Sequence, residues 1–425
     1  MSQSRVRIVG GGLTGILAAL KAHDLGCREI DLHERFDDLG GVARPRQSDG
    51  LELRDGCIYF GPRGDPMRGL LEQHGLLFED FENRFGSVSP GDGGRTVCTH
   101  DFGGPALATT DMTLTPRSGD RLSDRLQTYP EEICEALTRY CQWHLGPVLD
   151  EVHESAAIPL AINRVFPVGP DIADIVSGKR TNALQDELYG LPRGLWGRQS
   201  NTTASLPRDG FHAFLVQCRQ RLERLGVRVY DTSLVSPRHL LNAPTAGEAV
   251  VWAANPMPLF KVAGVASPGL IKKAFATYAF KASCRGSLPF YIQNFTATGA
   301  IFRLYLYETR GQTVLLAECV HEADEVDLRR EIDRLIAGFD GAWLKLGEQI
   351  GANVGPRWIY QSVDAMRRLT DLREAFARAM GDAFIPGAWE PYSKAEKFAQ
   401  VNAGLMAALG MGVAPGQTAA RTAAA

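Results

Sequence analysis

The first forty-five residues contain the pattern that most restricts how this chain can fold. A short run rich in β-branched residues at 6–9 leads directly into GGGLTG at 10–15, and an apolar helical stretch follows. A second β-type run at 29–33 ends at Glu34. A strand, a glycine-rich turn, a helix and a second strand that ends in an acid are typical of a dinucleotide-binding βαβ unit. We therefore expect a parallel sheet of the Rossmann-like type.

Each position of this turn has a distinct physical task in such a unit. Gly10 allows the tight turn, Gly12 lets the backbone approach a diphosphate, and Gly15 permits close packing of the helix on the strand. The free N–H groups and the positive end of the helix dipole then face the phosphates. Glu34 can accept both hydroxyl hydrogens of an adenosine ribose and would repel a 2′-phosphate. The sequence therefore favours FAD or NAD over NADP.

The residues after Glu34 separate these two cofactors. Arg35 follows the acid, and LGGVARP at 39–45 comes next. Gly40 and Gly41 offer a second stretch of backbone that can approach an extended cofactor, and Arg44 offers a cation for phosphate. This arrangement resembles the flavoprotein superfamily that contains protoporphyrinogen oxidases, monoamine oxidases, phytoene desaturases, UDP-galactopyranose mutases and the Rab GDP-dissociation inhibitors. The resemblance implies FAD, with Arg35, the glycine pair and Arg44 at its diphosphate and ribityl chain.

Two further segments resemble the parts of this superfamily that surround the flavin ring. Residues 55–63, which include Gly61, stand where these proteins bring a segment beside the isoalloxazine ring. Near the end of the chain, a strand that leads to Gly387 and Trp389 precedes an expected helix at 394–409. The resemblance implies that this second motif closes over the ribityl chain and the pyrimidine end of the flavin.

A third match lies in the middle of the chain. Residues 206–211 resemble the turn that returns the chain to the FAD-binding part in this superfamily, with an expected helix at 213–225 and a strand at 227–230. The resemblance places the backbone near Val235 against adenine. Residues 249–254 read as another buried strand of the same sheet.

The segments between these motifs are expected to bind the substrate. Residues 86–204 begin with a turn-prone stretch and contain one convincing helix at 131–145, whose apolar stripe is best explained as core. Residues 275–320 read as successive antiparallel strands, and a helix is expected at 327–339. The expected fold class is α/β, a Rossmann-like FAD-binding domain interleaved with a substrate domain built on an antiparallel sheet plus helices. The expected boundaries are 1–85, 205–265 and 365–412 for the FAD-binding domain, 86–204 and 266–364 for the substrate domain, and 413–425 for a disordered tail.

Catalytic residues are weakly marked, because a flavin performs hydride transfer itself and the protein need only position the substrate, exclude water and tune the charge nearby. Tyr59 and Arg63 are candidates in the ring segment. Arg303 and Tyr305 are candidates on the central strand of the substrate sheet, although Arg303 could equally be a solvated strand residue. Tyr392 is a candidate beside the second flavin motif.

Charge and cysteine usage exclude several other classes of protein. Lys and Arg total 46 and Asp and Glu 49, so the net charge of −3 provides no bulk field to hold nucleic acid. The eight cysteines form no CxxC pair and no HExxH occurs, which favours a reduced, cytoplasmic chain without a metal site. No secretory leader is recognisable, and no apolar run reaches the roughly 20 residues of a membrane span. No cysteine follows Cys319, so FAD is expected to be noncovalent, unlike the cysteine-linked flavin of monoamine oxidases.

The resemblance leaves three functions open. The first is an FAD-dependent oxidoreductase of the amine-oxidase and protoporphyrinogen-oxidase type, which takes hydride from a small-molecule substrate and passes electrons to oxygen or another acceptor. The second is a UDP-galactopyranose mutase-like isomerase, since 294–308 looks like its substrate strand and 189–192 falls near its loop; however, Gly387-Ala388 replaces its Gly-Arg pair. The third is a flavin-free binding protein like the Rab inhibitors, which retention of the glycines and of Glu34 opposes. We favour the first.

Overall fold

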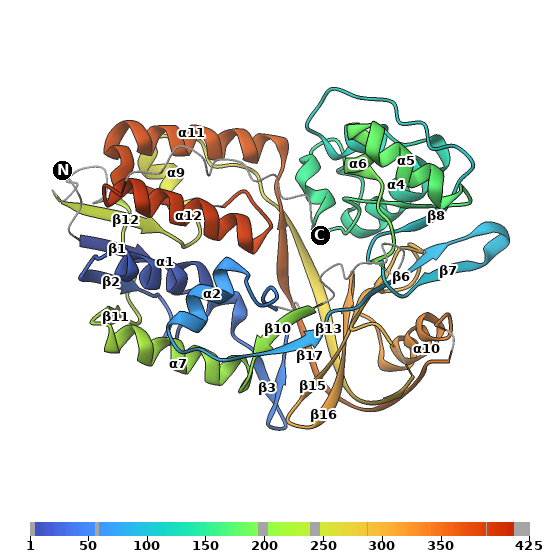
Figure 1. Ribbon diagram of the computed structural model, residues 1–425, viewed down its shortest axis with the longest axis horizontal. Coiled ribbons are helices and arrows are strands. Elements are labelled where there is room, and N and C mark those ends of the chain that lie inside the picture. The colour runs from blue at the N-terminus through green and yellow to red at the C-terminus, as the bar shows by residue number, and fades with distance from the viewer. Residues whose placement is uncertain are drawn as a thin grey trace.

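Two sheets organise the protein, as seen in a computed structural model that describes residues 5–55, 59–193, 203–238, 247–286, 288–339, 341–387 and 389–411. Figure 1 shows a parallel sheet with its helices on one side of the molecule and a larger sheet with a helical layer on the other. The long strands β13 (Ile271–Arg285) and β17 (Trp343–Tyr360) run between the two parts. The fold is therefore a mixed α/β architecture.

The parallel sheet has the strand order β11-β2-β1-β12-β18, and every neighbouring pair is parallel. Its strands are short and mostly buried, as expected for a sheet covered on both faces. The strands are β1 (Arg5–Val9), β2 (Glu29–His33), β11 (Arg228–Tyr230), β12 (Glu248–Trp252) and β18 (Phe384–Pro386).

Helices cover both faces of this sheet. One face shares a hydrophobic core with α1, α2, α7 and α12, and the other shares one with α9 and α11. The helices are α1 (Leu13–Asp24), α2 (Pro66–Gln73), α7 (Gly210–Arg224), α9 (Met257–Ala263), α11 (Val363–Met380) and α12 (Lys394–Ala408). The first turns of α1 and α12 thus belong to the same layer.

The larger sheet has seven strands in the order β17-β13-β16-β15-β14-β6-β7. All neighbouring pairs are antiparallel except β14 with β6, which are parallel. One of its faces packs Tyr305 and Tyr307 against Leu51 and Leu53 of the N-terminal part. The remaining strands of this sheet are β6 (Phe85–Pro90), β7 (Thr96–Thr99), β14 (Tyr291–Asn294), β15 (Ile301–Thr309) and β16 (Gln312–Cys319).

Helices and short strand pairs complete the fold. The helices α3 (Leu122–Leu126) and α4 (Glu131–Leu145) share a core with Phe275 and Phe302 of the larger sheet, and α10 (Glu325–Ile336) packs on the same sheet. The other elements are α5 (Ile172–Thr181), α6 (Ala183–Leu188), β3 (Arg46–Ser48) with β4 (Leu51–Leu53), β5 (Phe78–Glu82) with β10 (Thr203–Pro207), and β8 (Ala106–Ala108) with β9 (Phe166–Val168). Among the described residues, no helix is both long and apolar enough to cross a bilayer.

Most elements expected from the sequence are confirmed, with two corrections. The helix at 131–145 is α4, and the strands expected within 275–320 are β13, β14, β15 and β16. The turn-prone stretch from residue 86 was interpreted incompletely, because β6 and β7 form an edge of the larger sheet there. A Cβ on Gly86 would lie 2.6 Å from the Thr99 carbonyl oxygen, so this strand contains glycine because of close packing.

The second correction concerns the sheet type. The larger sheet was expected to be antiparallel, but the parallel pair β14–β6 makes it mixed. The expected tail at 413–425 lies outside the described residues.

Candidate cofactor and substrate site

Two glycines of the N-terminal turn are fixed by the packing of the protein itself. Gly10 has φ +106°, and a Cβ there would lie 2.7 Å from the Ala254 backbone nitrogen. A Cβ on Gly15 would lie 1.9 Å from the Gly10 carbonyl oxygen. The turn, the start of α1 and the end of β12 are therefore in close backbone contact.

Gly12 is different, because the protein leaves open space beside it. It precedes α1 with φ −69°, which any residue can adopt, and the nearest atom to a Cβ there is the Gly41 Cα at 4.0 Å. No side chain caps α1, and its first turn contains no acid. The N-terminus of α1 thus has the unsatisfied N–H groups and the positive dipole end that suit an anion.

Glu34 is held in position at the carboxyl end of β2. Its side chain is buried, with Oε2 accepting from the Gly11 N–H at 2.6 Å and Oε1 from the Phe36 N–H at 3.0 Å. Its carbonyl oxygen accepts from the Ser233 N–H at 2.8 Å, so the segment that leads to Val235 lies beside it. Each carboxylate oxygen has a second lone-pair direction, so the ribose role expected for this acid is compatible with these bonds.

The Gly40-Gly41 loop packs directly against the first turn. The Gly40 N–H donates to the Gly11 carbonyl oxygen at 2.8 Å, and Gly40 and Gly41 have φ +117° and +54°. Arg44 lies within ion-pair distance of the Asp37 and Asp38 carboxylates, at 3.7 and 3.8 Å. Its charge is therefore already opposed by two acids of its own loop.

Arg35 and Gly61 occupy contrasting surroundings. The Arg35 side chain is exposed and lies over the Phe36 ring, with the guanidinium carbon 4.4 Å from the ring centre. The Gly61 carbonyl oxygen accepts from the Ser205 hydroxyl at 2.8 Å, and a Cβ on Gly61 would lie 2.6 Å from Asp65. Residues 56–58 of the same ring segment lie outside the described residues.

The second flavin motif meets the parallel sheet at the end of β12. A Cβ on Gly387 would lie 2.4 Å from the Trp252 carbonyl oxygen, so glycine is required by this close approach. The Trp389 indole N–H donates to the same oxygen at 3.2 Å, which turns the ring toward β12. Ala388 lies outside the described residues.

Three of the five candidate catalytic residues lie along one chain of aromatic side chains. Ring-centre distances are 6.4 Å from Tyr59 to Phe85, 5.1 Å from Phe85 to Tyr291, and 5.4 Å from Tyr291 to Tyr305. The guanidinium carbon of Arg303 lies 5.2 Å from the Tyr305 ring centre. These contacts therefore connect Tyr59, in the segment expected beside a flavin ring, to the larger sheet.

Arg303 is not a solvated strand residue, so that alternative is wrong. Its side chain is 5% exposed, and its Nε donates to Glu318 Oε2 at 2.7 Å, with Glu318 fully buried. Burial is the largest single effect on the pKa of Arg303 and lowers it, but the Glu318 carboxylate together with Tyr305 and Tyr291 more than offsets burial, so the pKa is raised. Glu318 could not be recognised from the sequence, because the Arg303–Glu318 register exists only once β15 and β16 are paired.

Arg63 and Tyr392 do not join this aromatic chain in the described contacts. Arg63 is exposed. The Tyr392 hydroxyl oxygen accepts from the Gln361 N–H at 3.0 Å, between β17 and α11, and burial raises the pKa of Tyr392 to about 12. Tyr392 is thus a neutral side chain that joins the second motif to the end of β17.

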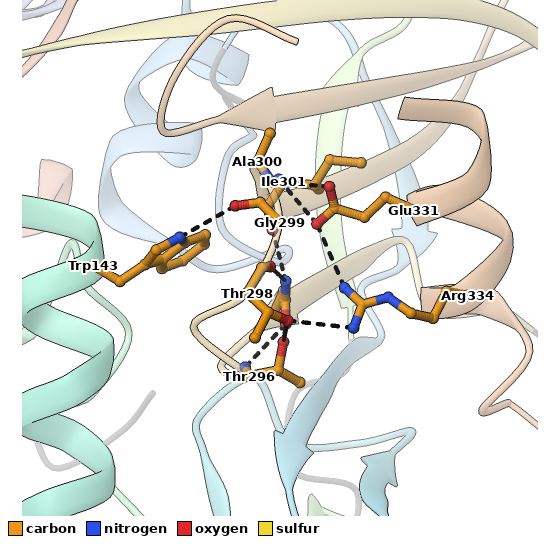
Figure 2. Close-up of polar contacts among 9 residues, drawn as sticks. Trp143, Thr296, Thr298, Gly299, Ala300, Ile301, Glu331 and Arg334 are labelled. Carbon is orange, nitrogen blue, oxygen red and sulfur yellow. Dashed lines mark hydrogen bonds and ion pairs between the residues drawn. The ribbon is translucent and has the colours of Figure 1, made fainter. Parts of the chain in front are cut away.

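The loop that joins β14 to β15 is anchored from two helices (Figure 2). From α10, the Glu331 carboxylate accepts from the N–H groups of Ala300 at 2.9 Å and Ile301 at 3.1 Å. From α4, the Trp143 indole N–H donates to the Gly299 carbonyl oxygen at 3.2 Å. These bonds fix the start of the strand that carries Arg303 and Tyr305.

The buried imidazole of His144 should make the protein less stable in mild acid. Its Nε2 lies 2.8 Å from the Tyr360 hydroxyl, and burial, aided by the charges of Arg303 and Lys273, lowers its pKa to about 3. The unfolded chain takes up a proton near the ordinary histidine pKa of about 6.5 while the folded chain does not, so stability falls with pH below that value. Between about pH 6.5 and about pH 5 this costs roughly 1.5 kcal/mol. Burial also lowers the pKa values of His33 and His74, so some loss is common to both proteins. Urea unfolding should therefore show a loss about 1.5 kcal/mol larger in the wild type than in His144→Gln. Equal losses in both would contradict the assignment.

The comparisons with known proteins agree with this architecture. A model of the NAD(P)-binding Rossmann-like domain matches residues 8–73, and no curated protein matches the chain. A reduced UDP-galactopyranose mutase structure is 13% identical and covers 97% of this chain and 96% of its own, with a TM-score of 0.64.

Two oxidase structures have the same arrangement. A putative protoporphyrinogen oxidase from Exiguobacterium sp. is 15% identical, with coverage of 96% of this chain and 99% of its own and a TM-score of 0.55. Cyclohexylamine oxidase from Brevibacterium oxydans is 13% identical, with coverage of 96% and 98% and a TM-score of 0.55. The chain therefore has the same fold as these three proteins, and its residues 8–73 match a Rossmann-like NAD(P)-binding domain.

Proposed function

We propose that this protein is an FAD-dependent oxidoreductase of the amine-oxidase and protoporphyrinogen-oxidase type. The observation that carries the proposal is Gly12, because the protein itself needs no glycine there and the open space lies in front of the uncapped start of α1. A backbone without a Cβ at that point lets a diphosphate reach the helix N–H groups. The residues present therefore fit a dinucleotide.

The proposed cofactor would be held noncovalently by groups from three parts of the parallel sheet. Glu34 would accept the ribose hydroxyls, and the backbone near Val235 would face adenine. The turn at Gly12 and the Gly40-Gly41 loop would lie along the diphosphate and ribityl chain. When bound, the flavin supplies a hydride acceptor at N5.

The aromatic chain that includes Tyr59 and Tyr305 supports a substrate side next to the ring segment. Its rings offer an apolar wall that excludes water and orients a small molecule by shape. Arg303 would keep this wall in place through its ion pair with Glu318. The mutase alternative expects an arginine on this strand to meet the substrate, and a guanidinium that is buried and paired with Glu318 does not support that role. Oxygen as electron acceptor and a cytoplasmic location remain part of this proposal.

The colour and FAD affinity of purified protein test the proposal. The wild type should show the visible absorption bands of oxidised flavin, or acquire them with added FAD. Gly12→Val should weaken FAD binding at least about 100-fold, or about 2.7 kcal/mol, because the side chain would occupy the diphosphate position. Gly69→Val is the matched control, since a Cβ on Gly69 of α2 also meets nothing within 4 Å. Equal affinity in the two variants, or no FAD binding by the wild type, would overturn the proposal.

Substrate-dependent bleaching distinguishes oxidoreductase from isomerase. A library of small amines and reduced ring compounds, mixed anaerobically with the FAD-loaded protein, should include one that bleaches the flavin without added reductant. Turnover of a nucleotide sugar only after dithionite reduction, with no net oxidation, would instead establish the mutase alternative.

A further inference from the structure

A small cavity of about 30 Å³ lies between α1 and α12. From α1 it is lined by Leu13 and Thr14, the two residues that follow Gly12, and from α12 by Lys394 and Lys397. Its remaining walls are apolar and come from Leu17, Met67, Phe398 and Val401. The two helices pack side by side (Figure 1), so the cavity joins the two flavin motifs of the sequence.

The two lysines of this cavity have different surroundings. The Lys394 ammonium donates to the Tyr59 carbonyl oxygen and lies 5.0 Å from the Tyr59 ring centre, so it is already bound to the ring segment. Lys397 is partly buried, and burial lowers its pKa although the Glu390 carboxylate acts in the opposite direction. Glu390 also forms an ion pair with Arg373, at 3.1 Å. Lys397 is therefore a cation in apolar surroundings whose nearby acid is shared.

A diphosphate at α1 carries more negative charge than the start of the helix can balance. A helix N-terminus provides only about half a unit charge. Arg44, the cation expected from the sequence, faces Asp37 and Asp38, and Glu34 adds a negative charge nearby. In apolar surroundings, a lysine interacts with phosphate more strongly than it would in water.

We propose that Lys397 binds the diphosphate of a nucleotide between α1 and α12, in place of the arginine expected after the Gly40-Gly41 pair. This inference rests on the proposed function, because it assigns a residue to the same dinucleotide site. Thr14, whose side chain carries a hydroxyl, lines the opposite wall. Lys397 is a binding residue here and takes no part in the chemistry.

Calorimetric titration with two probes, FAD and ADP, tests the assignment. Lys397→Met should weaken both by at least tenfold and reduce the dependence of their affinity on NaCl, since one ion pair is lost. Lys397→Arg should retain most of the affinity. Lys261→Met on α9 is the matched control, because α9 covers the opposite face of the same sheet. Thermal unfolding of each apoprotein verifies that the variants fold.

The outcomes separate this inference from the proposed function. If the wild type binds FAD and Lys397→Met binds it as tightly as Lys261→Met does, the role of Lys397 is overturned and the flavin proposal stands. If the wild type binds ADP but not FAD, and Lys397→Met weakens ADP, the diphosphate site stands and the flavin proposal falls. If the wild type binds neither probe, both are overturned.

Discussion

Arg303→Met should lose about 3–5 kcal/mol of unfolding free energy, the cost typical of breaking a buried ion pair by removing one partner. The Glu318 side chain is fully buried, and Arg303 Nε donates to its Oε2 at 2.7 Å. Methionine fills much of the same volume but leaves this carboxylate without its cation. Urea unfolding at neutral pH measures the loss.

The double variant Arg303→Met/Glu318→Leu identifies the source of that loss. Removing both charges should restore most of the stability, because a buried ion pair contributes little compared with apolar side chains of similar volume. Across the cycle, which also includes Glu318→Leu, the two single losses together should exceed the loss of the double variant by at least about 3 kcal/mol. A single variant within about 1 kcal/mol of the wild type would show that the pair is not buried as described.

The same pair also tests the catalytic role expected for Arg303. If Arg303 only positions the aromatic chain, the stable double variant should be bleached by substrate at close to the wild-type rate. If Arg303 contacts the reacting molecule, the double variant should fold and bind FAD but lose bleaching. Stability and chemistry are thus separated by one set of variants.

The part of the fold nearest the first motif could be predicted from sequence because its signals are local. The turn at 10–15 and the acid at Glu34 lie within one βαβ unit. The strand β1 follows from its β-branched residues, and β2 from its apolar residues between the first helix and the acid. The charge of Arg44 could be noted, but its pairing with Asp37 and Asp38 depends on how the loop folds back. The sequence therefore shows that residue 44 carries a positive charge, but not that this charge is already opposed by two acids.

The strand β17 was not predicted, and its glycines explain why. Gly347, Gly351 and Gly355 interrupt the apolar alternation that marks a strand. In the structure, a Cβ on Gly351 would lie 2.6 Å from Leu53 Cδ1, so this position contains glycine because the β3–β4 hairpin packs on it. The pairing of Arg303 with Glu318 was missed for a related reason, since both features are contacts between segments distant in sequence. A role for Lys397 could not be predicted from the sequence either, because only the packing of α12 on α1 places it across a cavity from Leu13 and Thr14.

Gly15→Ala should lose about 3 kcal/mol of unfolding free energy, at the upper end of the usual cost of overpacking. The added Cβ would lie 1.9 Å from the Gly10 carbonyl oxygen, which is far inside contact distance. Gly10 cannot withdraw easily, because its own Cα side already faces the Ala253 and Ala254 backbone and its N–H donates to the His33 carbonyl oxygen at 2.8 Å. Either α1 or the turn must move, and both belong to the core of the parallel sheet.

Two further alanine variants make this result specific to the contact. Gly69→Ala in α2 meets nothing within 4 Å, so it should gain up to about 1 kcal/mol from helix propensity. Gly12→Ala should lose no more than about 1 kcal/mol, the cost of alanine at a helix N-cap, while binding FAD more weakly, because its Cβ meets only open space. If Gly15→Ala instead matched Gly12→Ala in stability, the close packing of α1 on the turn would be contradicted. We thus expect three different roles for these glycines: Gly15 makes a packing contact, Gly12 lets a ligand approach the backbone, and Gly69 is neutral. The unfolding and binding measurements together distinguish these roles.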